Sequence, residues 1–259
     1  MRLIFLGTGT SFGVPQIGCD CAVCHSADPR DRRTRTGAVV EAGAARLLLD
    51  TPPELRLQLV GAGIGGVDAV LYTHAHADHV NGIDDLRAFS VGRSGPLPLY
   101  GPPEALDAIR QNFAYIFDDG IVPIPGTSKP RLETRALEAG VTAPVGGVPV
   151  LPLAFDHGPQ RVFGYRIGPL AYLTDVKAVP PPARAALRGV RVLVLNALWW
   201  RSHPTHLSIG EAVAVAQDLG VERTWLTHLT HETAHADLLR DLPGGIAPAH
   251  DGLVVEVPE

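Results

Sequence analysis

The chain has 259 residues and a formal net charge of -5 at pH 7. Its length suits one domain over residues 1–259 with a large core, and its charge offers no broad basic surface for a nucleic-acid polymer. No stretch approaches the ~18 apolar residues of a membrane span, and the apolar start over residues 1–7 is too short for a secretion signal. We therefore expect a cytoplasmic protein with no membrane partner.

Short apolar runs bounded by Gly, Pro or Asp predict β-strands. They cover residues 3–6, 38–40, 46–49, 69–72, 148–153, 162–167, 171–173, 190–195, 223–226 and 253–257. Helical spacing of apolar residues predicts helices over 53–60, 84–90, 104–113, 183–187, 209–219 and 234–239. Ser208 and Glu211 form a capping-box pattern at the start of the fifth helix. The proline-containing segment 119–147 is expected to lack regular structure and to cover or border the functional site as loops.

All three cysteines lie within six residues, at Cys19, Cys21 and Cys24. An odd number of thiols in so tight a cluster does not form a disulfide framework. Tetrahedral zinc takes four ligands, so a zinc-binding loop at about 19–24 needs one distant partner, usually a histidine. His25 is adjacent but cramped beside Cys24. The alternative is that the three thiols are incidental or buried.

A second cluster has the pattern HxHxDH and directly follows the apolar run 67–72. It consists of His74, His76, Asp78 and His79. At the end of a buried strand the first two histidines can point the same way, while Asp78 and His79 face them from the next turn. Imidazole and carboxylate together suit a hydrolytic metal centre with an open position. Three histidines and an aspartate in six residues are hard to explain as chance surface groups.

Three further candidate ligands each follow an apolar strand. His157 follows residues 150–155, Asp175 follows 171–174, and His228 follows 225–227. Ligands gathered at the ends of several strands indicate one cleft.

With these residues the chain resembles the metallo-β-lactamase superfamily, whose pattern is HxHxDH followed by a His, an Asp and a His. The resemblance implies an α/β fold, a four-layer αββα sandwich of the metallo-β-lactamase type. Asp50, at the end of residues 46–50, matches a buried Asp that orients the metal-binding loop. The segment 6–11, the three cysteines and the segment 227–232 are similar to PhnP-type cyclic-phosphate phosphodiesterases.

That resemblance implies two catalytic metal ions, Mn or Zn, and one structural Zn. One catalytic ion would be held by His74, His76, His157 and Asp175. The other would be held by Asp78, His79, His228 and Asp175, with Asp175 bridging. His231 would complete the zinc site of Cys19, Cys21 and Cys24 and so brace the loop that carries His228.

The same resemblance makes His206 and Asp78 the catalytic residues. His206 precedes the capped helix, where it would protonate a leaving oxygen and bind phosphate near backbone N–H groups. His203, His235 and His250 are interpreted as ordinary polar residues. The cluster Arg30, Arg32, Arg33 and Arg35 is interpreted as a solvated loop, and Trp199 and Trp200 as core residues, with an interface as the alternative.

The expected activity is hydrolysis of small phosphodiesters. Two divalent ions, two aspartates and one hydroxide leave a charge of about +1, which an anionic diester neutralises. The family's substrate is 5-phosphoribosyl 1,2-cyclic phosphate, in phosphonate metabolism, while 2′,3′-cyclic nucleotides fit the same size and charge argument. The resemblance also suggests a homodimer.

Three other functions stay open at this point. A tRNA 3′-end endonuclease shares the metal motifs, but the chain has no Lys-rich arm, and its only lysines are Lys129 and Lys177. A PqqB-type coenzyme-biosynthesis protein shares the cysteine-rich start. A non-catalytic, zinc-stabilised binding module would need only four ligands and no bridging carboxylate.

Overall fold

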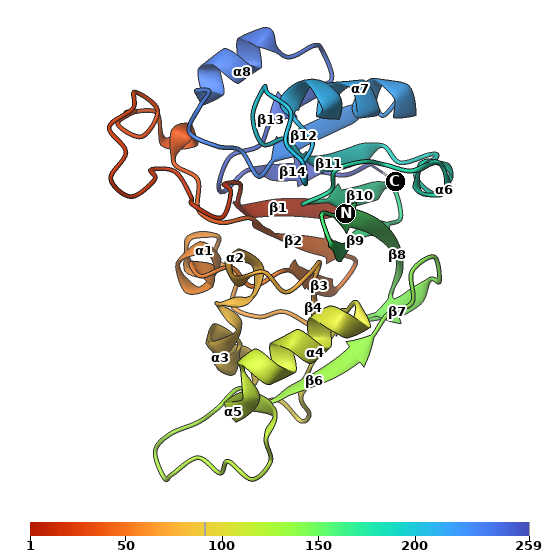
Figure 1. Ribbon diagram of the computed structural model, residues 1–259. Coiled ribbons are helices and arrows are strands. Elements are labelled where there is room, and N and C mark those ends of the chain that lie inside the picture. The colour runs from red at the N-terminus through yellow and green to blue at the C-terminus, as the bar shows by residue number, and fades with distance from the viewer. Residues whose placement is uncertain (91, 259) are drawn as a thin grey trace.

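The computed structural model describes residues 1–90 and 92–258. Two seven-stranded sheets face each other, and helices cover the outer side of each (Figure 1). The strand orders are β14-β1-β2-β3-β4-β5-β6 and β13-β12-β11-β10-β9-β8-β7. The expected αββα sandwich is therefore confirmed. No helix in the described ranges is long and apolar enough to cross a membrane.

The first sheet and its helices come from the first half of the chain. They are β1 (Arg2–Gly7), η1 (Pro29–Asp31), β2 (Gly37–Ala42), β3 (Ala45–Leu49), α1 (Leu55–Gly61), β4 (Ala69–Leu71), α2 (Ala77–Val80), η2 (Ile83–Leu86), α3 (Arg87–Ser90), β5 (Leu97–Gly101), α4 (Pro103–Asn112), α5 (Ala114–Phe117) and β6 (Leu132–Ala136), with β14 (Val254–Glu256) added at the end. The second sheet and its helices are β7 (Ala143–Val145), β8 (Val148–His157), β9 (Gln160–Ile167), β10 (Leu170–Leu173), α6 (Pro181–Ala186), β11 (Val192–Asn196), α7 (Ile209–Leu219), β12 (Arg223–Thr227), α8 (His235–Asp241) and β13 (Ile246–Pro248).

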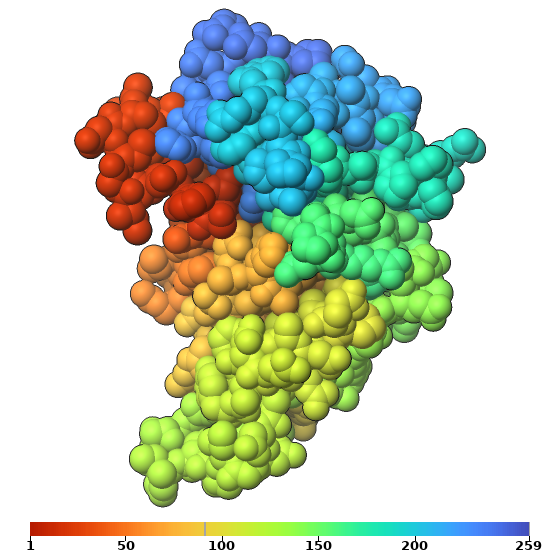
Figure 2. All heavy atoms as spheres, viewed as in Figure 1, coloured from red at the N-terminus to blue at the C-terminus, as the bar shows by residue number. Residues whose placement is uncertain are grey.

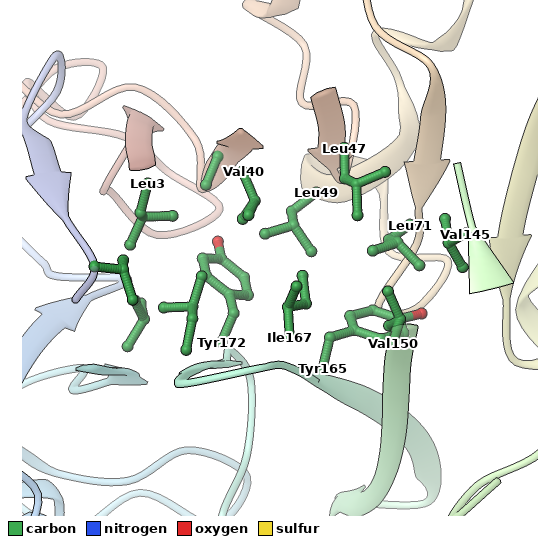
Figure 3. Packing of buried hydrophobic residues seen from close by; sticks show 14 of the residues in the cluster. Leu3, Val40, Leu47, Leu49, Leu71, Val145, Val150, Tyr165, Ile167 and Tyr172 are labelled. Atoms are coloured by element: carbon green, nitrogen blue, oxygen red, sulfur yellow. The ribbon is translucent and has the colours of Figure 1, made fainter. Parts of the chain in front are cut away.

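The central strands are apolar on both sides because both faces of each sheet are buried there. In β1, Leu3 and Phe5 join the core between the sheets, whereas Ile4 and Leu6 pack under the helices. This alternation follows from the two-residue period of a strand. Figure 3 shows the central core, where Leu49 and Leu71 of one sheet face Ile167 and other residues of the second.

All ten predicted strands and six predicted helices overlap observed elements, and the capping box of Ser208 and Glu211 is present at the start of α7. The expectation of no regular structure in 119–147 was wrong, because β6 and β7 lie there. Both are edge strands, where polar and proline residues are tolerated, so their sequences lack a strand signature. The loop between α5 and β6 projects from one end of the molecule (Figures 1 and 2).

Gly164 in β9 is required by close packing. A Cβ atom there would lie 2.3 Å from Cδ2 of Leu173 and 2.9 Å from Cε2 of Phe155. Both neighbours belong to the core beneath α6, α7 and α8. The sheet can therefore accommodate no larger side chain at this position without displacing that core.

We predict that Gly164→Ala lowers the free energy of unfolding by about 1–3 kcal/mol, the usual cost of overpacking a core. Gly61→Ala is the matched control, because a Cβ at Gly61 meets nothing within 4 Å and alanine favours the end of α1. Denaturant unfolding of both variants measures the difference. Equal stability of Gly164→Ala and the unmodified protein would contradict the packing described here.

Candidate metal centre

Asp50 organises the loop that follows β4. Its carboxylate accepts hydrogen bonds from the backbone N–H of Thr73 at 2.8 Å, from the Thr73 hydroxyl at 2.9 Å and from Nδ1 of His79 at 2.8 Å. Asp50 and His79 are both fully buried. A buried carboxylate needs such donors to offset its desolvation, so the position of Asp50 fixes both ends of the HxHxDH segment.

Three imidazoles are oriented by hydrogen bonds at Nδ1. His79 donates to Asp50, His157 donates to the Thr205 carbonyl at 3.0 Å, and His74 lies 2.9 Å from the Thr73 hydroxyl. That hydroxyl already donates to Asp50, so it accepts from His74. These contacts at Nδ1 direct Nε2 of His79 and of His157 into the cluster, while Nε2 of His74 lies 2.9 Å from Nδ1 of His76.

The Nε2 atoms of these three rings converge on Asp175. Nε2 of His79 lies 3.5 Å from Oδ1 of Asp175, and Nε2 of His74 and of His157 each lie 3.9 Å from Oδ2. Nε2 of His79 is buried and has no hydrogen-bond partner. Burial lowers the pKa of His79, but the carboxylates of Asp78 and Asp175 outweigh it and hold that pKa well above the ordinary value. A buried nitrogen without a partner beside two carboxylates is an arrangement that a bound cation would satisfy.

The described residues contain four groups whose potential ligand atoms all lie within 4.8 Å of one another. They are His74, His76, His157 and Asp175; Asp78, His79 and His228; Asp175, His206 and His228; and Cys19, Cys21, Cys24 and His231. Every residue that the sequence suggested as a metal ligand falls into one of these groups. Asp175 is grouped with His74, His76 and His157 and again with His206 and His228, but not with Asp78 and His79, whose group it was expected to join.

Strained backbone is concentrated at this cluster. Asp50, Asp175 and His228 have φ values of 61°, 58° and 57°, and they are the only non-glycine residues of the described chain with positive φ. Each follows the carboxyl end of a strand, namely β3, β10 or β12. Left-handed backbone costs energy in residues with a Cβ and is held where the surroundings require it. Nδ1 of His228 then lies 3.5 Å from Oδ1 of Asp175, while Asp50 faces Thr73 and His79.

The charges of the cluster favour a bound cation. Burial opposes ionisation of Asp175, yet the facing His228 and His79 hold its pKa well below the ordinary value. Burial also lowers the pKa of His74 and His157, and it lowers the pKa of His228 to about 4. These imidazoles are therefore neutral at pH 7, which is the form that binds metals.

His206 lies at the mouth of the cluster. Its Nε2 is 3.2 Å from Oδ2 of Asp175, and its Nδ1 is 3.0 Å from the Thr205 hydroxyl and 3.2 Å from Nδ1 of His203. Its side chain is 12% exposed, against 3% for Asp175. It can therefore meet both the buried carboxylate and a group arriving from solvent. His203, interpreted as an ordinary polar residue, helps to hold this ring.

The cysteine loop lies against His231. Nδ1 of His231 is 3.3 Å from Sγ of Cys19 and 3.2 Å from Sγ of Cys21, while the backbone N–H of Gln16 donates to Sγ of Cys24 at 3.3 Å. The backbone N–H of Cys24, followed by His231, lowers the pKa of Cys21 to about 6. Burial raises the pKa of Cys24 to about 11. The donor set suits tetrahedral zinc.

One of the four arginines expected in a solvated loop is buried. Arg33 is 2% exposed and donates to the Thr8 hydroxyl at 3.0 Å and the Ala249 carbonyl at 2.6 Å. It also lies 3.2 Å from Nδ1 of His235, a residue that is 2% exposed. The solvated interpretation was wrong for Arg33 because its guanidinium ties the segment that follows the cysteines to Thr8 and to the chain's carboxyl-terminal part.

The expectation that both tryptophans are core residues was also wrong. Trp200 is 48% exposed, and Trp199 is half-buried with the Arg201 guanidinium 3.6 Å from its ring centroid. Both follow β11 in the loop that leads to His206, so neither occupies a strand position.

Sequence reasoning missed the residues that orient the ligands. Thr73, Thr205 and Thr36 each contact a histidine of the cluster, and Asn196 accepts from the backbone N–H of Val176 at 2.8 Å beside Asp175. Threonines and asparagines are common in loops, so nothing in their spacing marks them. Only Thr73, directly before His74, had a position that could have drawn notice.

Comparison with known proteins identifies the family. Residues 45–229 match the model of the beta-lactamase superfamily domain. A crystal structure described as a new diphosphatase from the PhnP family is 38% identical, with a TM-score of 0.91, over 99% of this chain and 98% of that one.

Two curated relatives share part of their length with the chain. An octanoyltransferase of Porphyromonas gingivalis is 39% identical over 100% of this chain and 52% of that protein. A ribonuclease Z of Bradyrhizobium sp. is 33% identical over 63% of this chain and 48% of that protein. The chain thus spans about half the length of these two relatives. With a matched family model and a PhnP-family structure alike over nearly its whole length, the chain belongs to the metallo-β-lactamase superfamily and, within it, to the PhnP family.

Proposed function

We propose that the protein is a dinuclear, metal-dependent phosphodiesterase for small diesters, such as 5-phosphoribosyl 1,2-cyclic phosphate. The observation that carries the proposal is the convergence of five histidines and two aspartates, one of which is the central Asp175. A structural site closes with four ligands, whereas this cluster offers enough donors for two ions that share one carboxylate. The family membership supports hydrolysis as the type of reaction.

The residues fit two divalent ions. His74, His76, His157 and Asp175 would hold one, and Asp78, His79, His228 and Asp175 the other, as the resemblance to the family implies. Mixed imidazole and carboxylate donors suit Zn or Mn, with availability deciding between them. When bound, such ions lower the pKa of water and stabilise charge that develops on phosphoryl oxygens.

The protein's own residues would then orient the metal ligands and protonate the leaving oxygen. Asp50, Thr73 and the Thr205 carbonyl hold the imidazoles in one tautomer, so ligand geometry is set before substrate arrives. His206 faces Asp175 and is partly exposed, so it can give a proton from Nε2 to the leaving oxygen. A cyclic diester opened in this way becomes a monoester and releases no second fragment.

The cysteine loop would carry a structural zinc on Cys19, Cys21, Cys24 and His231. Only two residues separate His231 from His228. The zinc would therefore brace the segment that presents a catalytic ligand and take no part in the reaction itself.

A second candidate is hydrolysis of a diphosphate link, because the 38% identical structure is described as a diphosphatase. Attack on phosphorus and charge stabilisation would be the same, and the leaving group would be a phosphate oxygen. The octanoyltransferase name is not carried over, since the chain matches about half of that protein. The net charge of -5 weighs against the tRNA endonuclease alternative.

The remaining alternatives make different predictions. A PqqB-type protein or a non-catalytic binding module would turn over no phosphodiester. A binding module would also hold about one metal ion per chain, whereas the proposed enzyme holds three. A cytoplasmic location and a homodimer stay predictions.

The proposal is tested by an assay of the purified protein reconstituted with Mn²⁺ or with Zn²⁺. The substrates are bis-(p-nitrophenyl) phosphate, 5-phosphoribosyl 1,2-cyclic phosphate, a nucleoside diphosphate sugar and a pre-tRNA. We expect the unmodified protein to turn over the small diesters. Asp78→Ala should lose this turnover and about one metal ion per chain. The control Asp107→Ala, which changes an exposed aspartate on α4, should keep full activity. Turnover of the diphosphate alone would favour the second candidate, and unchanged turnover in Asp78→Ala would contradict the two-metal assignment.

His206→Ala should lower kcat by about 10²–10⁴-fold, the usual contribution of a general acid. Metal content, measured by plasma mass spectrometry, should stay at the level of the unmodified protein. Loss of a metal ion in parallel with activity would instead make His206 a ligand, a role that its place beside Asp175 and His228 also permits.

Cys21→Ser should remove one zinc per chain and lower the Tm by roughly 6–12 °C, as expected for a metal loss that costs about 3 kcal/mol. His25→Ala is the matched control, because His25 adjoins Cys24 but lies outside the four-residue group. Zinc analysis and calorimetry measure both effects. Retention of all zinc in Cys21→Ser would refute the structural site.

A further inference from the structure

The segment 6–11, which reads LGTGTS, has no part in the proposed chemistry. It extends from the end of β1, and among the described residues none of its members belongs to a group of potential metal ligands. Gly9 forms parallel β-bridges with Arg35 on one side and with Leu229 on the other. The segment therefore lies between the chain that leads into β2 and the residue that follows His228.

This close approach requires glycine at position 9. A Cβ atom there would lie 2.7 Å from the Arg33 carbonyl oxygen and 3.0 Å from the Cβ of Arg33. With no side chain in the way, the segment comes near enough for the backbone N–H of Leu229 to donate to the Thr8 carbonyl at 2.9 Å. The backbone on the carboxyl side of His228 is therefore fixed by a main-chain hydrogen bond.

Thr36 fixes the ring of the same histidine. Its side chain is fully buried, and its hydroxyl donates to the Gly9 carbonyl at 2.8 Å. Because the hydroxyl proton is used in that bond, Oγ1 accepts from Nδ1 of His228, which lies 3.1 Å away. Oδ1 of Asp175, 3.5 Å from the same nitrogen, is likewise an acceptor. The ring proton is therefore held on Nδ1, and Nε2 carries the lone pair that can bind a metal.

His228 needs this support because its backbone is strained. Its φ of 57° lies in the left-handed region, which a residue with a Cβ keeps only where its surroundings hold it. The Thr227 carbonyl accepts from the backbone N–H of Ala197 at 2.9 Å on one side of His228, and the bond to Thr8 lies on the other. Within the part of the chain that the structure describes, the Thr36 hydroxyl is the only hydrogen-bond partner of the ring.

We infer that Thr36 is a positioning residue for the metal ion proposed at His228. It holds Nε2 of the ring toward that ion, while the main chain around Gly9 holds the backbone turn, which gives the segment 6–11 its role. In the described chain, Thr36 contacts none of the histidines proposed for the other ion. The hydroxyl therefore acts on one ion and leaves the other unaffected. This inference rests on the proposed two-metal centre.

The test measures the two ions separately in the Mn²⁺-loaded protein. Mn²⁺ reports on the histidine and aspartate cluster, because thiolates are poor ligands for it. A chelator is added in steps, and the Mn²⁺ that is released is measured by electron paramagnetic resonance. Thr36→Val keeps nearly the same side-chain shape but removes the hydroxyl. In this variant one ion should be lost at a chelator concentration about 10–100-fold lower than in the unmodified protein, and the other at an unchanged concentration.

Three further variants separate positioning from a general loss of stability. Thr36→Ser restores the hydroxyl and should release both ions as the unmodified protein does. Thr224→Val makes the same change at another buried threonine, on β12, whose hydroxyl has no hydrogen-bond partner among the described residues. It should also keep both ions. Thr36→Ala removes the hydroxyl as well and takes the place of Thr36→Val if that variant does not fold.

Turnover of bis-(p-nitrophenyl) phosphate, measured on the same samples, separates this inference from the proposed function. Early loss of one ion in Thr36→Val, without turnover by any of the proteins, would keep the inference and reject the phosphodiesterase. Unchanged release from Thr36→Val, or equal weakening of both ions, would overturn the inference even if diesters are hydrolysed. Fewer than two Mn²⁺ ions per chain in the unmodified protein would reject the two-metal centre and this inference with it.

Discussion

Asp50 is a fully buried carboxylate whose two oxygens accept three hydrogen bonds from the loop after β4. It ties the first residue of that loop, Thr73, to its last histidine, His79. Because Thr73 in turn accepts from His74, one carboxylate sets the orientation of two imidazoles. A desolvated charge with this many donors is costly to disturb. The metal cluster depends on this carboxylate, although Asp50 is outside every group of potential ligands.

The two sheets supply the cluster from both sides. One sheet contributes the loop after β4, and the other contributes the ends of β8, β10 and β12. The apolar core between the sheets, seen in Figure 3, keeps these strand ends in register. Stability and site geometry are therefore linked, because a shift of one sheet against the other would separate Asp175 from the histidines of the opposite sheet.

A buried polar network connects the cysteine loop to the rest of the molecule. Arg33 donates to Thr8 and to the Ala249 carbonyl, and the backbone N–H of Leu229 donates to the Thr8 carbonyl at 2.9 Å. The Thr36 hydroxyl donates to the Gly9 carbonyl and lies 3.1 Å from Nδ1 of His228. The chain segments on either side of the cysteines thus reach the ring of a candidate catalytic ligand through ordinary hydrogen bonds.

The sequence alone was enough to predict where the elements with strong periodicity lie and to single out the candidate ligands. Strands such as β1 are buried on both faces and appear as continuous apolar runs, and His and Asp at their ends are rare enough to be noticed. β6 and β7 were missed because edge strands carry polar residues and proline. Arg33 was misassigned because burial of an arginine depends on partners more than 200 residues away, such as Ala249. The contact between Thr36 and His228 could not be predicted either, since the two residues are 192 positions apart in the sequence and meet only in the folded chain.

Asp175 is proposed to lie between two metal ions. A crystal structure of the protein grown with Zn²⁺, with anomalous data collected above and below the zinc edge, tests it most directly. The proposed sites predict three anomalous difference peaks per chain. Two should lie on opposite sides of the Asp175 carboxylate, and one among Cys19, Cys21, Cys24 and His231. A single peak near Asp175, or none, with the cysteine peak present, would contradict the two-metal centre and leave only a zinc-stabilised fold.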